Sequence, residues 1–334
     1  MINKIEININ NLPLIEGLRV RKFVGEADFP AMITIIEAAS KPDNQQVAIT
    51  LEEIRHDYQH LNNSDPYQDM IIVEIKDTPI AYSRVEWYQE EEPNDRIYQF
   101  FVHITPEWRY QGIEDAMIRW SEARLLTIAS DHPLDSERFF QTYSFPQRPG
   151  FNQILESFDY KIVRYAFEMS RSLVNIPTAE LPKGIEVRPV IEEDWRKVWE
   201  ASIEAFRDHW GYSEPPENEF ESYKSSKYFQ PDLWQVAWHG NDVVGSVMNY
   251  IDHDYNQKYD RKRGWTESIT TKKEWRSKGI ASALIVSSMH MHKALGMTEV
   301  GLGVDTNNPT GALHVYQKLG YHEDKTMFTY RKTL

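Results

Sequence analysis

The segment from Arg276 to Ala281, R-S-K-G-I-A, has the residue types of a phosphate cradle. A helix that begins after Gly279 would direct unpaired backbone N–H groups at an anion, and the glycine permits an unusual backbone while Ala281 leaves room beside it. Arg276 and Lys278 add positive charge. We therefore expect this turn to bind a pyrophosphate group, although a basic turn before a surface helix would have the same pattern.

Other residue types that carry chemistry give no comparable motif. The chain has no cysteine, which excludes disulfides, thiolate nucleophiles and Cys-ligated metal sites. His290 and His292 are two residues apart on an expected helix, so their side chains face different sides and do not form a metal pair. The sequence also lacks the G-x-S-x-G, H-E-x-x-H and G-x-x-x-x-G-K-[ST] patterns. We expect no metal site, and hydrolase, zinc-protease and nucleotidase functions lose their usual support.

The elements around the cradle follow from periodicity. We expect a strand near 265–270, then a helix from about Gly279 that ends at Gly296. Residues 299–305 alternate between apolar side chains on one face and two glycines on the other, which predicts a strand with a bare face that a ligand could approach. Upstream, we expect a helix at 194–206, a hairpin at 233–251 and a charged loop at 252–264.

The chain repeats itself with one register. Residues 18–23 resemble 185–190, and 107–113 resemble 274–280, both with an offset of 167. Because chance matches would seldom keep one register over this distance, we infer a tandem duplication, with a linker rich in proline at 171–184. Each half has the order of strands and helices of a mixed α/β fold. The expected domains are 1–176 and 177–334.

The C-terminal motif makes a family resemblance plain. The cradle, the helix, the alternating strand and the pattern N-x-x-x-A-x-x-x-Y-x-x-x-G-Y at 308–321 resemble the acyl-CoA-binding half of GNAT-superfamily N-acetyltransferases. The duplication resembles the mycothiol-synthase-like members. The resemblance implies two tandem domains, each with a mixed, mostly antiparallel sheet flanked by helices. It implies acetyl-CoA as co-substrate, held by Ile269, Thr270, Arg276, Ser277, Lys278, Gly279, Ile280, Ala281 and Asn308.

Two side chains are candidates for proton transfer in such a reaction. The reference pKa of a thiol is about 8.5 and that of tyrosine about 10, so the hydroxyl of Tyr316 near the sulfur could assist departure of the thiolate. An attacking amine must lose a proton, and Glu267, on the strand before the cradle, could accept it. Each has a structural alternative: Tyr316 as a packed aromatic on a helix, and Glu267 as a solvated strand carboxylate.

The first half departs from the pattern at two positions. The offset places Glu114 at the position of Ala281, and near the end of each half Leu155 falls at the position of Tyr316. A carboxylate in the cradle would repel a bound pyrophosphate, and leucine cannot donate a proton. We therefore expect residues 1–176 to form a degenerate, non-catalytic domain and residues 177–334 to bind acetyl-CoA and carry the reaction.

Composition excludes several classes of protein. Of 334 residues, 41% are hydrophobic and 13% aromatic, enough for two ordinary cores, so the chain is not disordered. The net charge of −14 disfavours nucleic acid and anionic membrane as partners. Neither a membrane span nor a signal peptide is visible, and we expect a cytoplasmic protein. A basic cluster within 258–278 favours a small polyanionic ligand; the oligomeric state is not predicted.

These observations lead to one main hypothesis and two alternatives. We expect an N-acetyltransferase that transfers the acetyl group of acetyl-CoA directly, in a ternary complex, to a primary amine of a small-molecule acceptor. One alternative is an acyl-CoA-binding sensor that performs no transfer. The other is a structural or partner-binding duplication with both cradles empty.

Overall fold

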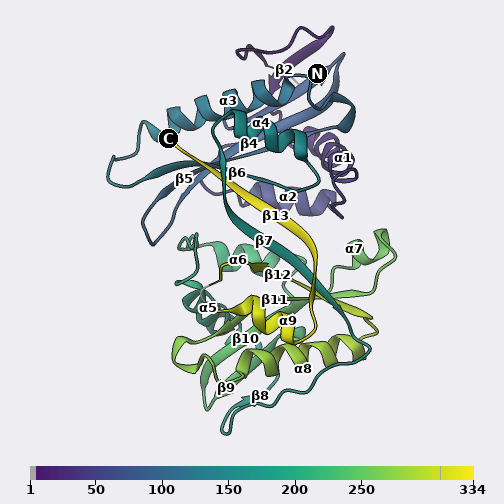
Figure 1. Ribbon diagram of the computed structural model, residues 1–334, viewed down its shortest axis with the longest axis vertical. Coiled ribbons are helices and arrows are strands. Elements are labelled where there is room, and N and C mark those ends of the chain that lie inside the picture. The colour runs from purple at the N-terminus through teal and green to yellow at the C-terminus, as the bar shows by residue number, and fades with distance from the viewer. Residues whose placement is uncertain (1–4, 309) are drawn as a thin grey trace. The chain divides into compact units, whose positions relative to one another are not determined.

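The structure, a computed structural model, describes residues 5–308 and 310–334. The chain forms two compact units. The first contains residues 1–164 and 327–334, and the second contains residues 165–326 (Figure 1).

Within the described residues, the helices of the first unit and most of its strands lie before residue 164. In chain order its elements are β1 (Glu6–Ile7), β2 (Leu18–Lys22), α1 (Phe29–Ser40), α2 (Leu51–Gln59), β3 (Met70–Ile75), β4 (Thr78–Gln89), β5 (Arg96–Ile104), α3 (Ile113–Ala129), β6 (Arg138–Ser144) and α4 (Pro149–Ser157). Strand β7 (Lys161–Ser172) then leads into the second unit.

The second unit repeats this order from β2 onward, with one additional helix, α7. Its elements are β8 (Glu186–Val187), α5 (Trp195–Phe206), α6 (Glu219–Ser225), β9 (Gln235–His239), β10 (Asp242–Tyr250), α7 (His253–Lys258), β11 (Arg263–Thr271), α8 (Ile280–Ala294), β12 (Glu299–Asp305), α9 (Ala312–Lys318) and the start of β13 (His322–Thr333). Within the described residues, no helix has both the length and the apolar character that crossing a membrane requires.

Most of the predicted elements are confirmed. The strand at 299–305, the helix after Gly279 and the helix ending at Phe206 lie where the sequence predicts them. The loop expected at 252–264 is wrong in two places, because α7 lies inside it and β11 already begins at Arg263. Asp252 accounts for the missed helix: its side chain accepts a hydrogen bond from the Tyr255 amide at 2.9 Å and caps α7.

Each unit has a mixed, mostly antiparallel sheet, as predicted. The strand order is β1-β2-β3-β4-β5-β6-β13 in the first unit and β7-β12-β11-β10-β9-β8 in the second. Two neighbouring pairs are parallel, β5 with β6 and β11 with β12. The parallel pair in the second unit flanks the predicted cradle.

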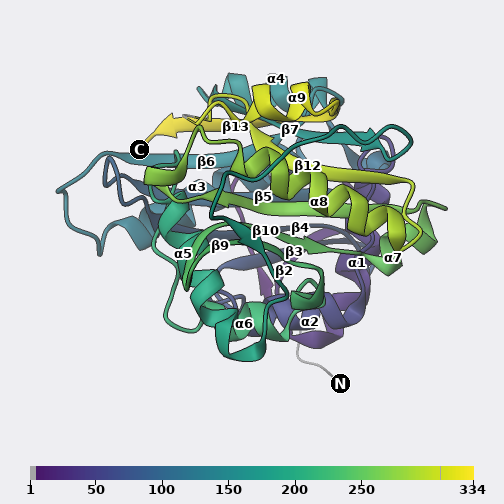
Figure 2. The ribbon, with the colours of Figure 1, turned by 90° about the horizontal axis from the view of Figure 1, so that it is seen from below.

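Alternating side chains bury both faces of each sheet. In β10, Val244 and Val247 join the core beneath α8, whereas Val243 and Met248 join the core beneath α5. Figure 2 shows α8 and α6 on opposite sides of β10. The first unit follows the same rule, with Ile71 of β3 in one core and Met70 and Ile72 in the other. Apolar burial on both faces holds the strands that carry the site.

The last strands of the two halves are exchanged. In the first unit β6 pairs with residues 328–333 of β13, and in the second unit β12 pairs with residues 166–172 of β7. The compact units therefore differ from the expected boundary between residues 176 and 177, because each takes a strand from the other half of the sequence. The linker that we expected packs in the second unit, with Leu173 in its core and Ile176 and Leu181 against it, while Val174 is exposed.

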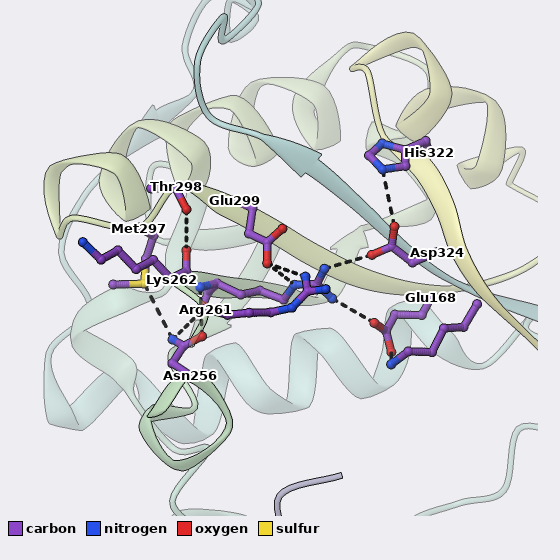
Figure 3. A network of polar contacts seen from close by, with 11 residues as sticks. Glu168, Asn256, Arg261, Lys262, Met297, Thr298, Glu299, His322 and Asp324 are labelled. Carbon is purple, nitrogen blue, oxygen red and sulfur yellow. Dashed lines mark hydrogen bonds and ion pairs between the residues drawn. The ribbon is translucent and has the colours of Figure 1, made fainter. Parts of the chain in front are cut away.

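A buried arginine holds the strands of the second unit together. Arg263 of β11 is 1% exposed and its guanidinium binds Glu168 at 2.8 Å, Asp324 at 2.9 Å and Glu299 at 3.0 Å. These carboxylates come from β7, β13 and β12, and Figure 3 shows them converging. The guanidinium thus connects β11 to three other strands. Arg263 belongs to the basic cluster that we expected to bind a polyanionic ligand, but its charge is already paired within the protein.

Replacing Arg263 by methionine should destabilise the protein by about 1.5–3 kcal/mol, because it removes a buried guanidinium that hydrogen-bonds to three carboxylates at once. Urea unfolding followed by tryptophan fluorescence measures the change. The matched control is Arg261→Met, which removes a more exposed guanidinium 2.7 Å from Glu299 and should cost at most about 1 kcal/mol. Equal losses in the two variants would contradict the assignment of Arg263 as the strand-joining residue.

Candidate active site

A cavity of about 630 Å³ lies in the second unit, between the divergent ends of β11 and β12. The two strands pair only from Arg263 to Trp265, opposite Glu299 to Gly301, and then separate. The cavity brings together most of the predicted site residues, namely Glu267, Ile269, Thr270, Arg276, Ser277, Gly279, Ile280, Ala281, Asn308 and Tyr316. Lys278 does not line it.

The cradle has the backbone conformation that the sequence predicts. Ser277 and Gly279 both lie in the left-handed region, with φ of 61° and 84°. Helix α8 starts directly afterwards at Ile280 and runs for 15 residues, so the N–H groups of its first turn have no acceptor within the helix. Ala281 lines the cavity beside them. These amides and the positive end of the helix dipole form a site for an anion.

Arg276 does not point its charge at this anion site. Its guanidinium makes a two-pronged ion pair with Asp208, one contact of which is 3.1 Å, and donates to the carbonyls of Ala205 at 3.0 Å and Thr271 at 3.2 Å. The hydrogen bond from Arg276 lowers the pKa of Asp208. The side chain therefore ties the cradle to the end of α5, and the backbone amides are the groups of the cradle that remain to contact an anion.

Lys278 is held by an aromatic ring. Its ammonium lies 4.6 Å from the ring centre of Trp275, a cation–π contact with a residue that lines the cavity, although Lys278 itself does not line it. Of the two basic residues that we expected to add charge to the cradle, one is paired and the other lies on an aromatic ring.

A bulge in β11 shapes the floor of the cavity. Met248 of β10 pairs with Glu267 and Ser246 pairs with Thr270, so β11 has one extra residue between these pairs. The bulge includes Ser268, whose φ of 46° lies in the left-handed region. The bulge interrupts the ladder where Ile269 and Thr270 line the cavity, the two positions at which the family resemblance implies main-chain pairing with pantetheine.

Glu267 is fixed at the point where β11 and β12 separate. Its Oε1 accepts a hydrogen bond from the Gly303 amide at 3.1 Å. Burial raises the pKa of Glu267 to about 8, with a smaller contribution from the charge of Glu168 and against the opposing hydrogen bond from Gly303. This carboxylate can therefore exchange a proton near neutral pH.

Tyr316 of α9 lies in the wall of the same cavity and is 6% exposed. Burial, followed by the charge of Glu267 and by Tyr321, raises the pKa of Tyr316 above its usual value. The phenol therefore stays protonated at neutral pH and can donate a hydrogen bond. The cavity thus joins one proton acceptor and one proton donor next to the anion cradle.

Sequence reasoning missed several residues of the cavity. Asp208 and His209 line it, and the sequence gives no local pattern that places them there. Burial lowers the pKa of His209, which is therefore neutral at pH 7. Of the two glycines expected to leave the strand bare, Gly303 lines the cavity, whereas a side chain at Gly301 would meet Trp265 at 3.0 Å. In the described part of the chain, no group of three His, Asp or Glu side chains could hold a metal ion.

Comparisons with known proteins agree with this geometry. The sequence model of the Acetyltransferase (GNAT) family matches residues 195–321. An N-alpha-acetyltransferase MAK3 of Arabidopsis thaliana is 29% identical over 109 residues, which span 33% of this chain and 55% of that protein. The chain thus covers about half the length of that relative. A mycothiol acetyltransferase of Pseudarthrobacter chlorophenolicus is 22% identical over 239 residues, 69% of this chain and 68% of that protein.

A solved structure extends the likeness to nearly the whole chain. The GCN5-related N-acetyltransferase of Sphaerobacter thermophilus superposes with a TM-score of 0.73 and 25% identity, over 96% of each chain. The matched family segment contains the cradle, Glu267 and Tyr316, and the fold of the first unit is included in the superposition. Residues 195–321 therefore match a GNAT acetyltransferase domain, and the fold of the whole chain resembles that of tandem GNAT proteins.

Proposed function

We propose that this chain is an acetyl-CoA-dependent N-acetyltransferase that acts on a primary amine of a small-molecule acceptor, by direct transfer in a ternary complex. The observation that carries the proposal is the single cavity in which an anion cradle at 277–281 adjoins Glu267 and Tyr316. The first-turn amides of α8 would hold the pyrophosphate of CoA. Asn308 also lines the cavity, beside the expected path of the thiol arm.

The two titratable groups suit the two proton transfers of the reaction. The amine nitrogen bonds to the thioester carbonyl carbon, the amine proton passes to the Glu267 carboxylate, and the carbon–sulfur bond breaks. The departing thiolate accepts a hydrogen bond or a proton from the Tyr316 hydroxyl. Because a nucleophilic amine must be neutral, a base with a pKa near 8 is well matched to its task.

The pH dependence of kcat/KM should report Glu267. Only the ionised carboxylate can accept a proton, so the profile should contain an inflection near pH 8, below which the rate falls more steeply than titration of the acceptor amine alone would cause. The matched variant is Glu267→Gln, which keeps the shape and should lower kcat about 10²–10⁴-fold.

The variant also separates the enzyme's titration from that of the substrate, because the acceptor amine titrates in both proteins. The inflection near pH 8 should therefore be present in the wild type and absent in Glu267→Gln. Identical profiles, whatever the absolute rates, would show that Glu267 is not the base.

A screen of primary amines, with release of free CoA thiol as the signal, tests the function itself. The proposal expects at least one small-molecule amine to give turnover that depends on both substrates. Tight binding of acetyl-CoA without turnover on any amine or peptide N-terminus would favour the sensor alternative. Failure of acetyl-CoA to bind at all, measured by thermal shift, would contradict both functions.

A further inference from the structure

The first unit contains the backbone of a second cradle. Tyr110 and Gly112 have φ of 61° and 85°, against 61° and 84° for Ser277 and Gly279, and the offset is again 167. Helix α3 begins directly after Gly112, as α8 begins after Gly279. The conformation that exposes amides to an anion in the second unit is therefore repeated in the first.

The supporting ion pair is repeated as well. Arg109 contacts both carboxylate oxygens of Asp43, at 2.7 and 2.9 Å, and donates to the Ala39 carbonyl at 2.6 Å. Arg276 makes the same set of contacts to Asp208 and Ala205. Because the guanidinium makes the same contacts in both units, we assign it a structural role, in which it fixes the position of the turn, and not the role of a phosphate ligand.

What differs is the occupant of the cradle. The Glu114 side chain is completely buried, and both of its carboxylate oxygens lie 3.0 Å from the Tyr110 amide. That amide corresponds to the Ser277 amide of the second unit. The carboxylate thus accepts, inside the folded chain, a hydrogen bond of the kind that a phosphate oxygen would accept.

A second side chain fills the neighbouring space. Arg148 immediately precedes α4, as Gly311 precedes α9, and it is only 8% exposed. Its guanidinium lies 4.1 Å from the ring centre of Phe151, and its Nε lies 3.5 Å from Oδ2 of Asp43. In the second unit the corresponding region is cavity wall, formed by small side chains such as Thr310 and Ala312.

Together these groups form a charge-balanced cluster. Two cations, Arg109 and Arg148, face two anions, Asp43 and Glu114, and burial makes an uncompensated charge expensive. A diphosphate entering this cradle would add negative charge beside Glu114 and would have to displace Arg148. The cluster is complete without a ligand.

We propose that the first cradle is closed by its own Glu114 and Arg148 side chains, with the Glu114 carboxylate in the place of a phosphate, so that each chain binds one acyl-CoA and binds it in the second unit. The inference rests on the proposed function for the identity of the ligand. It explains why the first unit keeps the backbone of the cradle: the turn binds an anion, and that anion is the Glu114 carboxylate of the same chain.

The test is the stoichiometry of acetyl-CoA binding by calorimetry on the full chain. The wild type should bind one molecule, and Ala281→Glu, which transfers the internal carboxylate to the second cradle, should bind none. In the Ala281→Glu background, the double change Glu114→Ala with Arg148→Ala removes one anion and one cation. It should restore one site, now in the first unit.

Two acetyl-CoA molecules bound to the wild type, or no binding by the triple variant when its melting curve shows a folded protein, would overturn the inference. The first measurement leaves the first unit untouched, so it decides the matter even if the triple variant does not fold. A wild type that binds no acetyl-CoA would contradict the proposed function, whereas recovery of binding in the triple variant would still support closure by Glu114 and Arg148.

Discussion

Ala281→Glu should lower the affinity for acetyl-CoA about a hundredfold or more. The new carboxylate would reach the Ser277 amide as Glu114 reaches the Tyr110 amide in the first unit. There it would compete with the diphosphate for an N–H group and repel it. At about 5 Å and an effective dielectric constant of about 20, each pair of charges costs about 3 kcal/mol, which is about a hundredfold in the dissociation constant.

Ala281→Gln is the matched control, because it adds nearly the same bulk without the charge. Calorimetry should show a smaller loss of affinity for Ala281→Gln than for Ala281→Glu, and thermal melting should show that both variants fold. If acetyl-CoA binds to Ala281→Glu as tightly as to the wild type, the cradle at 277–281 is not the pyrophosphate site.

Tyr316→Phe should lower kcat about 10²-fold or more while leaving the dissociation constant of acetyl-CoA almost unchanged. The hydroxyl would act when the thiolate leaves, so its removal weakens binding of the transition state and spares the ground state. The phenyl ring remains to fill the cavity wall, where Tyr316 is almost completely buried. Steady-state kinetics combined with calorimetry separates the two effects.

A neighbouring tyrosine supplies the control for packing. Tyr321 is also buried, its ring centre lies 6.0 Å from that of Tyr316, and its hydroxyl lies 3.1 Å from Oγ1 of Thr266. Tyr321→Phe should therefore lower stability by about 1 kcal/mol and leave kcat nearly intact. If Tyr316→Phe behaves like Tyr321→Phe, Tyr316 is a core aromatic and not the acid.

Local features of the site could be predicted from the sequence because each has a local cause. The turn at Gly279 follows from the freedom of glycine to adopt positive φ, and the helix and strand after it follow from their apolar periods. The mixed α/β class followed from the order of these local patterns within each half. These signals lie within a few residues of the elements that they specify.

The remaining features depend on residues far apart in the sequence. The bulge at Ser268 exists only relative to the register of β10, and the pairing of Arg276 with Asp208 joins positions 68 residues apart. The sequence predicts that Arg276 adds positive charge to the cradle, because no local pattern shows that its guanidinium is paired with Asp208. Glu114 was predicted to repel a ligand, but its hydrogen bond to Tyr110 becomes visible only in the folded turn.

The exchange of last strands has a consequence for the order in which the chain can fold during synthesis. The first unit needs residues 328–333 beside β6, and these are synthesised only after the whole of the second unit. About 160 residues separate the two parts of that unit, so at roughly 5–20 residues per second its sheet stays open for roughly 10–30 seconds. During that interval β6 presents an unpaired edge, which is an opportunity for aggregation. A chain that stops before residue 328 would therefore lack a strand of the N-terminal unit, although that unit was mostly translated first.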